Sequence, residues 1–449
     1  MRGAWLGAFG ALALLAVAAV ARVPMPVGSP GAAPATVSSD WRTYLHEIGS
    51  NEANLAVGGD GAMYVLLVPV GLGGLTINRS DDAGVTWSEV FPESGQLTLA
   101  LVTGLEGDLA AFGKDVVYVA TNAAGGVSAR SEDGGWHWKA TTITGPGSDQ
   151  AWVFLGPTKA HILQSKPYAL AAWFRIGPTL TFSFDGGATW GPPTVAAGAD
   201  TLNVSQDLQP VTAPLGINPD YLDDTGLPGP LNPACIATAR PPGGGAPRVA
   251  GAGFAGMRAG LHGGWGTDGA FYWAEYHLGS LYVCRYHAVS GIWDGTVFPV
   301  HDVPLTHRKT THLAFDERGT LYVLQANRLY VSLDRGHSFA YHHALDVWGD
   351  YPNSTDHANQ AFAVAGGEGH FAFRTADGCV TYRHAEGLDG PQASWGKPEC
   401  VRATNDSRID FPQIALGPGG IPTLGYGVGD PNLGAAQAWA ATSTRLLPP

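Results

Sequence analysis

Short apolar runs joined by glycine-containing turns recur along this chain. Four segments have one form, in which a short apolar run leads into a turn and then into a second apolar run. These segments begin at Leu55, Leu313, Phe362 and Ile414, and the last three starts are 49 and 52 residues apart (362 − 313 and 414 − 362). Apolar runs joined by Asp-Gly, Glu-Gly or Gly-Gly turns predict β-hairpins, and a fixed period predicts a repeat architecture.

A second repeat has the pattern Ser-x-Asp-x-Gly-x-(Thr/Ser)-(Trp/Phe). Its starts differ by 51, 52 and 149 residues (131 − 80, 183 − 131 and 332 − 183). Ser and Asp side chains can accept hydrogen bonds from nearby N–H groups, Gly adopts backbone angles that other residues resist, and the aromatic buries apolar surface. We therefore predict structural, turn-forming roles for Ser80, Asp82, Trp87, Ser131, Asp133, Trp138, Ser183, Asp185, Trp190, Ser332, Asp334 and Phe339.

The second pattern resembles the Asp-box, or bacterial neuraminidase repeat. That repeat occurs in sialidases, sortilin-type receptors, some plant-polysaccharide hydrolases and photosystem assembly factors. The resemblance implies a sialidase-like β-propeller. It leaves the function open, because these relatives share blades and not chemistry.

Together the two repeats predict four-stranded antiparallel blades. In each blade an inner hairpin precedes an outer hairpin that carries the Ser-x-Asp pattern. We expect residues 41–449 to form a single all-β propeller, with an irregular insertion around residues 200–270. Seven blades fit the spacing best, and six or eight stay open because the irregular region can hold one blade or two.

Composition excludes some classes of partner. Of the 449 residues, 14% are charged, and the net charge is −13 with no basic block. An acidic chain of this kind is not expected to bind nucleic acid or to adhere electrostatically to an anionic membrane.

The N-terminus has the pattern of a targeting segment. Arg2 precedes an apolar run from Ala4 to Ala21, and Ala19-Val20-Ala21 fits a cleavage site. We expect residues 1–21 to be a signal peptide, with an uncleaved anchor as the alternative. Residues 22–40, rich in Pro, Ala and Gly, are expected to be a linker. The protein is therefore expected to be secreted or extracytoplasmic, with membrane attachment only through an uncleaved N-terminus.

Four cysteines agree with export. Their positions favour the pairs Cys235–Cys284 and Cys379–Cys400, although four cysteines allow three connectivities. No Cys/His cluster has zinc spacing. The acidic turn with Asp220, Asp223 and Asp224 could bind Ca²⁺ or be a solvated loop; we favour the loop and expect no cofactor.

Polar residues precede the inner-strand segments, where a propeller exposes its central channel. From this ring we select Glu52, Asp207, His312, His357 and Asp410 as candidate ligand-binding residues. Carboxylates, amides and imidazoles in such a ring suit a polyhydroxylated or charged ligand. The alternative is that these groups satisfy one another and trapped water.

A sialidase mechanism needs arginines for the substrate carboxylate, a Tyr nucleophile activated by Glu, and an acid/base Asp. Under the resemblance, the candidate catalytic residues are Arg175, Arg285, Arg374, Glu275 and Tyr426. Two departures weaken this assignment. The first inner strand, Asn51–Val57, has no Arg, and Gly177 follows Phe174-Arg175-Ile176 where the family has Pro.

Two functional hypotheses follow. The first is a secreted, sialidase-like propeller that recognises a glycan or another polar ligand at the channel face, and that is an exo-sialidase-type glycoside hydrolase if the arginines converge. The second is a non-catalytic propeller that binds a protein or an extracellular polymer. Whether the protein is an enzyme stays open.

Overall fold

The computed structural model divides the chain into two units, residues 1–34 and 35–449. All described residues belong to the second unit. They are residues 38, 40–48, 50–69, 75–91, 107–122, 125–143, 151–157, 166, 168–174, 179–192, 194–195, 263–277, 280–287, 292–299, 311–316, 318–325, 327–345, 360–375, 379–403, 409–417, 420–428 and 437–444. The predicted signal peptide (1–21) and nearly all of the predicted insertion (200–270) lie outside them.

Every regular element of the described residues is a β-strand, and the strands form seven antiparallel sheets, each with a hydrogen-bonded path of four strands. Six of these paths follow the order of the chain, and the seventh joins β1 to β29. We number the sheets as blades 1–7. Blades 1–3 comprise β2 (Ser50–Val57), β3 (Met63–Pro69), β4 (Thr76–Ser80), β5 (Ser88–Phe91); β6 (Gly107–Phe112), β7 (Asp115–Asn122), β8 (Gly125–Ser131), β9 (Lys139–Ile143); β10 (Ala151–Pro157), β11 (Tyr168–Phe174), β12 (Thr179–Ser183) and β13 (Thr194–Val195).

The remaining strands build blades 4–7. They are β14 (Gly263–Trp265), β15 (Phe271–His277), β16 (Ser280–His287), β17 (Ile292–Pro299); β18 (Thr311–Phe315), β19 (Leu321–Gln325), β20 (Arg328–Ser332), β21 (Tyr341–Ala344); β22 (Gln360–Ala365), β23 (Glu368–Arg374), β24 (Cys379–Glu386), β25 (Ser394–Trp395), with β26 (Glu399–Ala403) also pairing with β24; and β27 (Ile409–Leu416), β28 (Pro422–Val428), β29 (Gln437–Ser443) and β1 (Trp41–Ile48).

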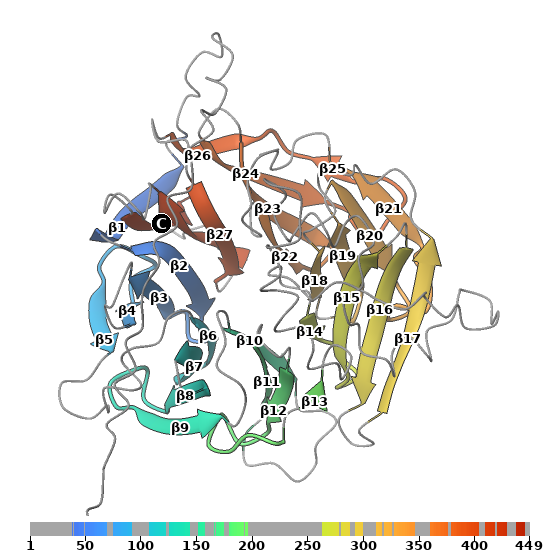
Figure 1. The fold of residues 1–449 in the computed structure, drawn as a ribbon. Helices are drawn as coiled ribbons and strands as arrows, with labels where there is room; N and C mark the ends of the chain where they lie inside the picture. The colour runs from blue at the N-terminus through green and yellow to red at the C-terminus, as the bar shows by residue number, and fades with distance from the viewer. Residues whose placement is uncertain are drawn as a thin grey trace, which may run out of the picture. The chain divides into compact units, whose positions relative to one another are not determined.

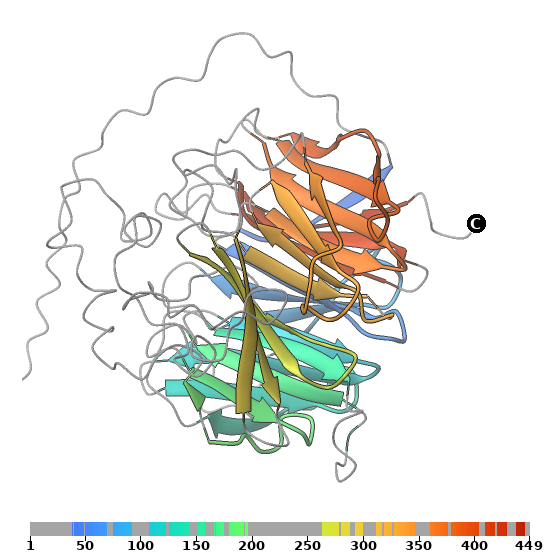
Figure 2. The ribbon, with the colours of Figure 1, turned by 90° about the vertical axis from the view of Figure 1, so that its right-hand side faces the viewer.

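The first strands of the blades contact one another in a closed ring. Strand β2 contacts both β6 and β27, and the series β6, β10, β14, β18, β22, β27 completes the circle. Figure 1 views the ring approximately down its central axis, and Figure 2 shows the same blades from the side. The prediction of a seven-bladed all-β propeller is confirmed.

Blade 7 closes the ring by joining β1, the first strand in chain order, to β27–β29, the last three strands. Strand β1, the first of the chain, pairs antiparallel with β29, from Trp41 opposite Ser443 to Ile48 opposite Gln437. The Trp41 ring also packs against Tyr382 of blade 6 with centroids 4.9 Å apart, and its Nε1 donates to the Glu399 carboxylate at 3.2 Å. The N-terminal strand therefore holds blades 6 and 7 together.

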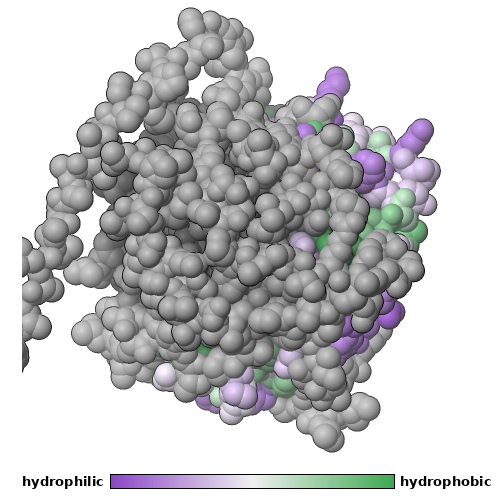
Figure 3. All heavy atoms as spheres, turned by 45° about the vertical axis from the view of Figure 1, so that its right-hand side comes forward, coloured by the Kyte–Doolittle hydropathy of each residue, from purple (hydrophilic) through white to green (hydrophobic). Residues whose placement is uncertain are grey.

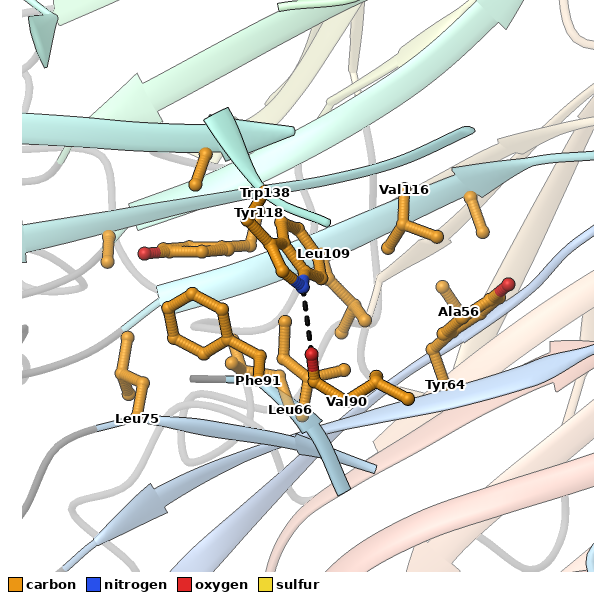
Figure 4. Close-up of a cluster of buried hydrophobic side chains, with 14 of the residues drawn as sticks. Ala56, Tyr64, Leu66, Leu75, Val90, Phe91, Leu109, Val116, Tyr118 and Trp138 are labelled. Atoms are coloured by element: carbon orange, nitrogen blue, oxygen red, sulfur yellow. Dashed lines mark hydrogen bonds between the residues drawn. The ribbon is translucent and has the colours of Figure 1, made fainter. Parts of the chain in front are cut away.

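Seven clusters of buried side chains form the core, and each lies between two neighbouring blades. The cluster between blades 1 and 2 includes Tyr64, Phe91, Tyr118 and Trp138 (Figure 4). Within it, the Trp138 indole N–H donates to the Val90 carbonyl of the preceding blade at 2.9 Å. Both faces of each blade are thus buried, and the Trp138 indole brought into this interface has a backbone partner.

Antiparallel pairing gives the propeller two different ends. At one end, which we call the turn end, lie the turns between the first and second strands and between the third and fourth strands of a blade. At the opposite end, the connection end, the second strand leads to the third and one blade leads to the next. The four Ser-x-Asp segments all lie at the turn end, between β4 and β5, β8 and β9, β12 and β13, and β20 and β21.

Each Ser-x-Asp turn is closed by its own hydrogen bonds. In blade 1, Asp82 accepts bonds from the Ser80 hydroxyl at 2.9 Å, from the Thr86 N–H at 2.8 Å and from the Thr86 hydroxyl at 2.7 Å. The Gly84 N–H donates to Ser80 Oγ at 2.9 Å, with Gly84 at φ +79°. A non-glycine residue resists this left-handed angle, which explains the glycine. Desolvation raises the pKa of Asp82, but hydrogen bonds from Thr86, Ser80 and Val85 outweigh it and lower that pKa.

A second link at the turn end joins second-strand tyrosines to acidic residues in or directly after the turn between the first and second strands. Tyr272 donates to Asp268 at 2.7 Å, and Tyr168 donates to Asp115 at 2.9 Å. Tyr118, on the second strand of blade 2, is also fully buried, but no described group hydrogen-bonds its hydroxyl.

Disulfide Cys379–Cys400 joins β24 to β26, which confirms that predicted pair. Cys284 is disulfide-bonded as well, and its predicted partner Cys235 lies outside the described residues. Within the described part of the chain, no helix is long and apolar enough to span a membrane.

The Ser-x-Asp turns give a first prediction. Replacing Asp82→Ala removes the acceptor of several turn hydrogen bonds and should lower the free energy of unfolding by about 1–2 kcal/mol. Asp81→Ala is the matched control, because the Asp81 side chain is 62% exposed and pairs with Arg79 at the surface. That change should cost at most about 1 kcal/mol. Denaturant titration of both variants measures the difference, and equal losses would contradict the assigned role of Asp82.

The tyrosine links give a second prediction. Tyr272→Phe removes the hydroxyl that donates to Asp268 Oδ2, while Oδ1 keeps the Ala270 N–H, and should destabilise the protein by about 1 kcal/mol. Tyr118→Phe removes a buried hydroxyl that has no described partner, so it should be neutral or slightly stabilising. Thermal unfolding of the two variants tests this opposition.

Candidate functional site

One position on the inner strands carries a polar side chain in four blades. Asn54, Asp108, His312 and Gln413 each come directly before a Leu-Ala or Ile-Ala pair. The strand that carries each of them ends three or four residues later. The four residues therefore lie at a similar level of the strands that surround the central axis.

At this level, side chains link one blade to the next. The Asn54 amide of blade 1 donates to the Gly107 carbonyl of blade 2 at 2.6 Å. Farther along the inner strands, at the last residue of β14, the Trp265 indole N–H of blade 4 donates to the Phe154 carbonyl of blade 3 at 3.2 Å. These bonds satisfy inner-strand carbonyls, so the structural alternative holds for Asn54.

Asp108 of blade 2 carries an ionisable group at this level whose pKa is altered by burial. Its carboxyl accepts the Leu109 N–H at 2.8 Å and the Val153 N–H of blade 3 at 3.1 Å. Burial raises the pKa of Asp108 to about 7, and the two backbone hydrogen bonds only partly oppose this effect. A carboxyl with such a pKa can donate a proton near neutral pH. Both its oxygens nevertheless accept backbone bonds, so its described contacts are those of a link between blades.

His312 of blade 5 is 2% exposed, and its ring lies edge-on to Phe362 of blade 6 with centroids 6.2 Å apart. The preceding residue, Thr311, donates to Gln325 of the neighbouring strand. His312 is thus packed between two blades at the level of Asn54 and Asp108.

The other predicted ligand-binding residues divide into two groups. Glu52 and Asp410 lie near the starts of the inner strands β2 and β27, at the connection end, as expected for the ring. Asp207 and His357 lie outside the described residues, as does the acidic turn with Asp220, Asp223 and Asp224.

The structure does not bring the predicted catalytic arginines together. Arg285 lies near the turn end of β16, 6% exposed, where its Nε donates to Asp294 at 2.6 Å. Arg374 ends β23 at the connection end of another blade. Arg175 lies outside the described residues. Because antiparallel pairing fixes Arg285 at the opposite end from Arg374, Arg285 cannot join an arginine cluster at the channel face.

Tyr426 and Glu275 also lie apart. Tyr426 is fully buried in the cluster between blades 6 and 7, and no described group hydrogen-bonds its hydroxyl. Burial raises the pKa of Tyr426, which opposes the formation of a phenolate nucleophile. Glu275 belongs to β15 of blade 4, which is not a neighbour of blade 7. The two therefore do not form a nucleophile–base pair.

Sequence reasoning missed Asp108 and one group of metal-ligating side chains. The signal for Asp108 was available, since Asp108-Leu109-Ala110 repeats the form of Asn54-Leu55-Ala56 and His312-Leu313-Ala314. The group that could hold a metal ion is Glu368, His370 and His384 of blade 6. The two histidines of this group are 14 residues apart in the sequence (384 − 370), a spacing that matches no metal motif considered in the sequence analysis.

The described outer surface is mixed in character. Its exposed large hydrophobic side chains come from blades 1, 2, 3 and 5, and they are Val85, Phe112, Trp136, Leu155 and Leu333. In the view of Figure 3, hydrophilic and hydrophobic side chains share the described surface. Scattered apolar residues are normal on soluble proteins, so they do not indicate a docking patch.

No protein-family model matches the chain, and no curated protein matches it. Among solved structures, a YCF48 protein bound to D1 peptide is 10% identical, with 91% of this chain and 98% of that chain covered and a TM-score of 0.45. A Trypanosoma rangeli sialidase with the inhibitor DANA is 10% identical, with 88% and 55% covered and a TM-score of 0.40. An Aleuria aurantia lectin with Fucα1-6GlcNAc is 9% identical, with 80% and 99% covered and a TM-score of 0.41. The chain thus spans 55% of the sialidase's length.

The raised pKa of Asp108 gives a prediction for stability against pH. In the unfolded chain an Asp loses its proton near pH 4, whereas the folded protein holds the Asp108 proton up to about pH 7. The folded state binds more protons between these values, so stability from this group should fall as pH rises from about 4 to 7. Asp108→Asn, whose amide mimics the protonated carboxyl, should flatten this part of the profile.

Denaturant unfolding at several pH values between 4 and 7 measures the effect. Glu89→Gln, at an exposed position on the outer strand β5, is the control and should keep the wild-type slope. Identical slopes for wild type and Asp108→Asn would show that Asp108 titrates normally.

Proposed function

We propose that this protein is an exported, ligand-binding propeller that recognises a neutral or cationic glycan at the connection end of its channel. The observation that carries the proposal is the placement of Glu52 and Asp410 near the connection end of the inner strands of two adjacent blades, 1 and 7. Carboxylates accept hydrogen bonds from paired sugar hydroxyls, and a polar ring around a concave axis suits such a ligand.

The turn end supports this choice by elimination. Its Ser-x-Asp turns and tyrosine links already use their polar side chains internally, as in the contacts of Asp82 and Asp268. Glu52 and Asp410 lie near the connection end of their strands, away from these turns. A ligand at the channel face would meet this end of the inner strands.

The charge of the inner strands supports a neutral or cationic sugar over sialic acid. A sialic acid carboxylate needs arginine partners, because guanidinium binds it bidentately. Arg285 is engaged with Asp294 at the turn end, while the inner-strand positions identified above include three acids. An acidic ring repels an anionic ligand. Binding is therefore proposed ahead of exo-sialidase hydrolysis.

A glycan array probed with the purified protein tests the proposal. We expect binding to neutral or amino-sugar glycans, and a loss of about 10- to 100-fold in affinity for Glu52→Gln or Asp410→Asn. This range corresponds to about 1.5–3 kcal/mol for a hydrogen bond to a charged group. Glu89→Gln should bind like wild type.

Three outcomes would overturn the proposal. One is the absence of glycan binding, and another is binding that Glu52→Gln and Asp410→Asn leave unchanged. The third is turnover of a fluorogenic sialoside that is lost in Arg374→Ala, which would favour a sialidase. Binding to a protein partner without any glycan would support the non-catalytic, protein-binding hypothesis instead.

A further inference from the structure

Blade 6 brings three metal-ligating side chains together at its turn end. Glu368 and His370 come from the start of β23, and His384 comes from the end of β24. One donor atom from each lies within 4.8 Å of the others. This group is separate from the inner-strand site described above.

The sheet register explains why these donors meet. His370 lies directly opposite His384 in the antiparallel pair, and Glu368 is two residues before His370. Side chains alternate between the two faces of a strand, so Glu368 and His370 project from one face, and opposed residues project from the same face. Tyr382, two residues before His384, shares this face, which packs against blade 7.

We propose that Glu368, His370 and His384 bind a divalent transition-metal ion, with Zn²⁺ as the best fit. Two imidazoles and one carboxylate form a known ligand set for zinc. Bonds of about 2.0–2.1 Å in tetrahedral geometry place two ligand atoms about 3.3 Å apart. The His384 Nε2 and Glu368 Oε2 atoms are already 3.2 Å apart.

The surroundings of His370 prepare it for this role. Its Nδ1 is hydrogen-bonded to the Tyr382 hydroxyl at 2.7 Å, which fixes the ring and leaves Nε2 as the nitrogen for an ion. An outer-shell partner of this kind is typical of metal-bound histidines.

The other two ligands give an ion a way in from solvent. The Glu368 side chain is 54% exposed and the His384 side chain is 32% exposed, whereas His370 is 3% exposed. A simple surface ion pair between Glu368 and His384 would need no third donor. The buried, oriented imidazole of His370 is what distinguishes the group from such a pair.

An ion at this place would strengthen the closure of the ring. His370 contacts Tyr382, and Tyr382 packs against Trp41 of the N-terminal strand β1. A metal bond to His370 would restrain this chain of contacts. Since an ion that binds only the folded state stabilises it by mass action, Zn²⁺ should raise the melting temperature of the protein.

Zinc titration of the chelator-stripped full chain tests the proposal, with a chromogenic chelator as competitor. We expect one equivalent of Zn²⁺ to bind, and affinity to fall at least about tenfold in Glu368→Gln and in His384→Gln. Glu368 is largely exposed, so its substitution should leave the fold intact. His342→Gln is the control, because His342 is an exposed histidine on blade 5. Co²⁺ in place of Zn²⁺ should give the visible absorption of a four-coordinate site, and Glu368→Gln should change that spectrum.

Two results would overturn the proposal. One is the absence of tight Zn²⁺ binding by the wild-type protein. The other is the same stoichiometry and affinity in the double variant His370→Gln/His384→Gln, with circular dichroism showing it folded. If the double variant does not fold, unchanged binding and melting shift in Glu368→Gln would have the same meaning.

Discussion

The packing of each blade against both of its neighbours is the interaction on which this structure depends. Seven buried clusters occupy the seven interfaces, and no blade has a core of its own within the described residues. A single blade would expose two apolar faces, so the ring must close before every face is covered. Closure pairs β1, the first strand in chain order, with the sheet of the last three strands, β27–β29. The stability of each blade therefore depends on closure of the whole ring.

The two ends of the propeller serve different purposes because of this packing. At the turn end, the Ser-x-Asp turns fit closely against the preceding blade. A Cβ atom on Gly135 would lie 2.8 Å from Val90 Cγ2, and one on Gly336 would lie 3.0 Å from Val283 Cγ1. Such contacts leave little freedom for ligand binding. Function is therefore sought on the inner strands toward the connection end, and a metal site at the turn end would reinforce the fold.

The inner strands show how one polar position can serve both stability and chemistry. Asn54 and Asp108 each bond to the backbone of the next blade, so both hold the inner ring together. Asp108 differs because its carboxyl can gain or lose a proton near neutral pH.

The sequence by itself determined the features that depend on neighbouring residues. The period, the hairpins and the Ser-x-Asp turns follow from alternation, glycine and side-chain hydrogen bonds within a few residues, and the structure contains them. The tertiary structure alone decided what depends on strands far apart in the chain. Examples are the pairing of β1 with β29, the position of Arg285 at the turn end, the burial of Tyr426 and the meeting of His370 with His384. Strand register and ring closure set these positions, and both arise from contacts that local sequence patterns do not specify.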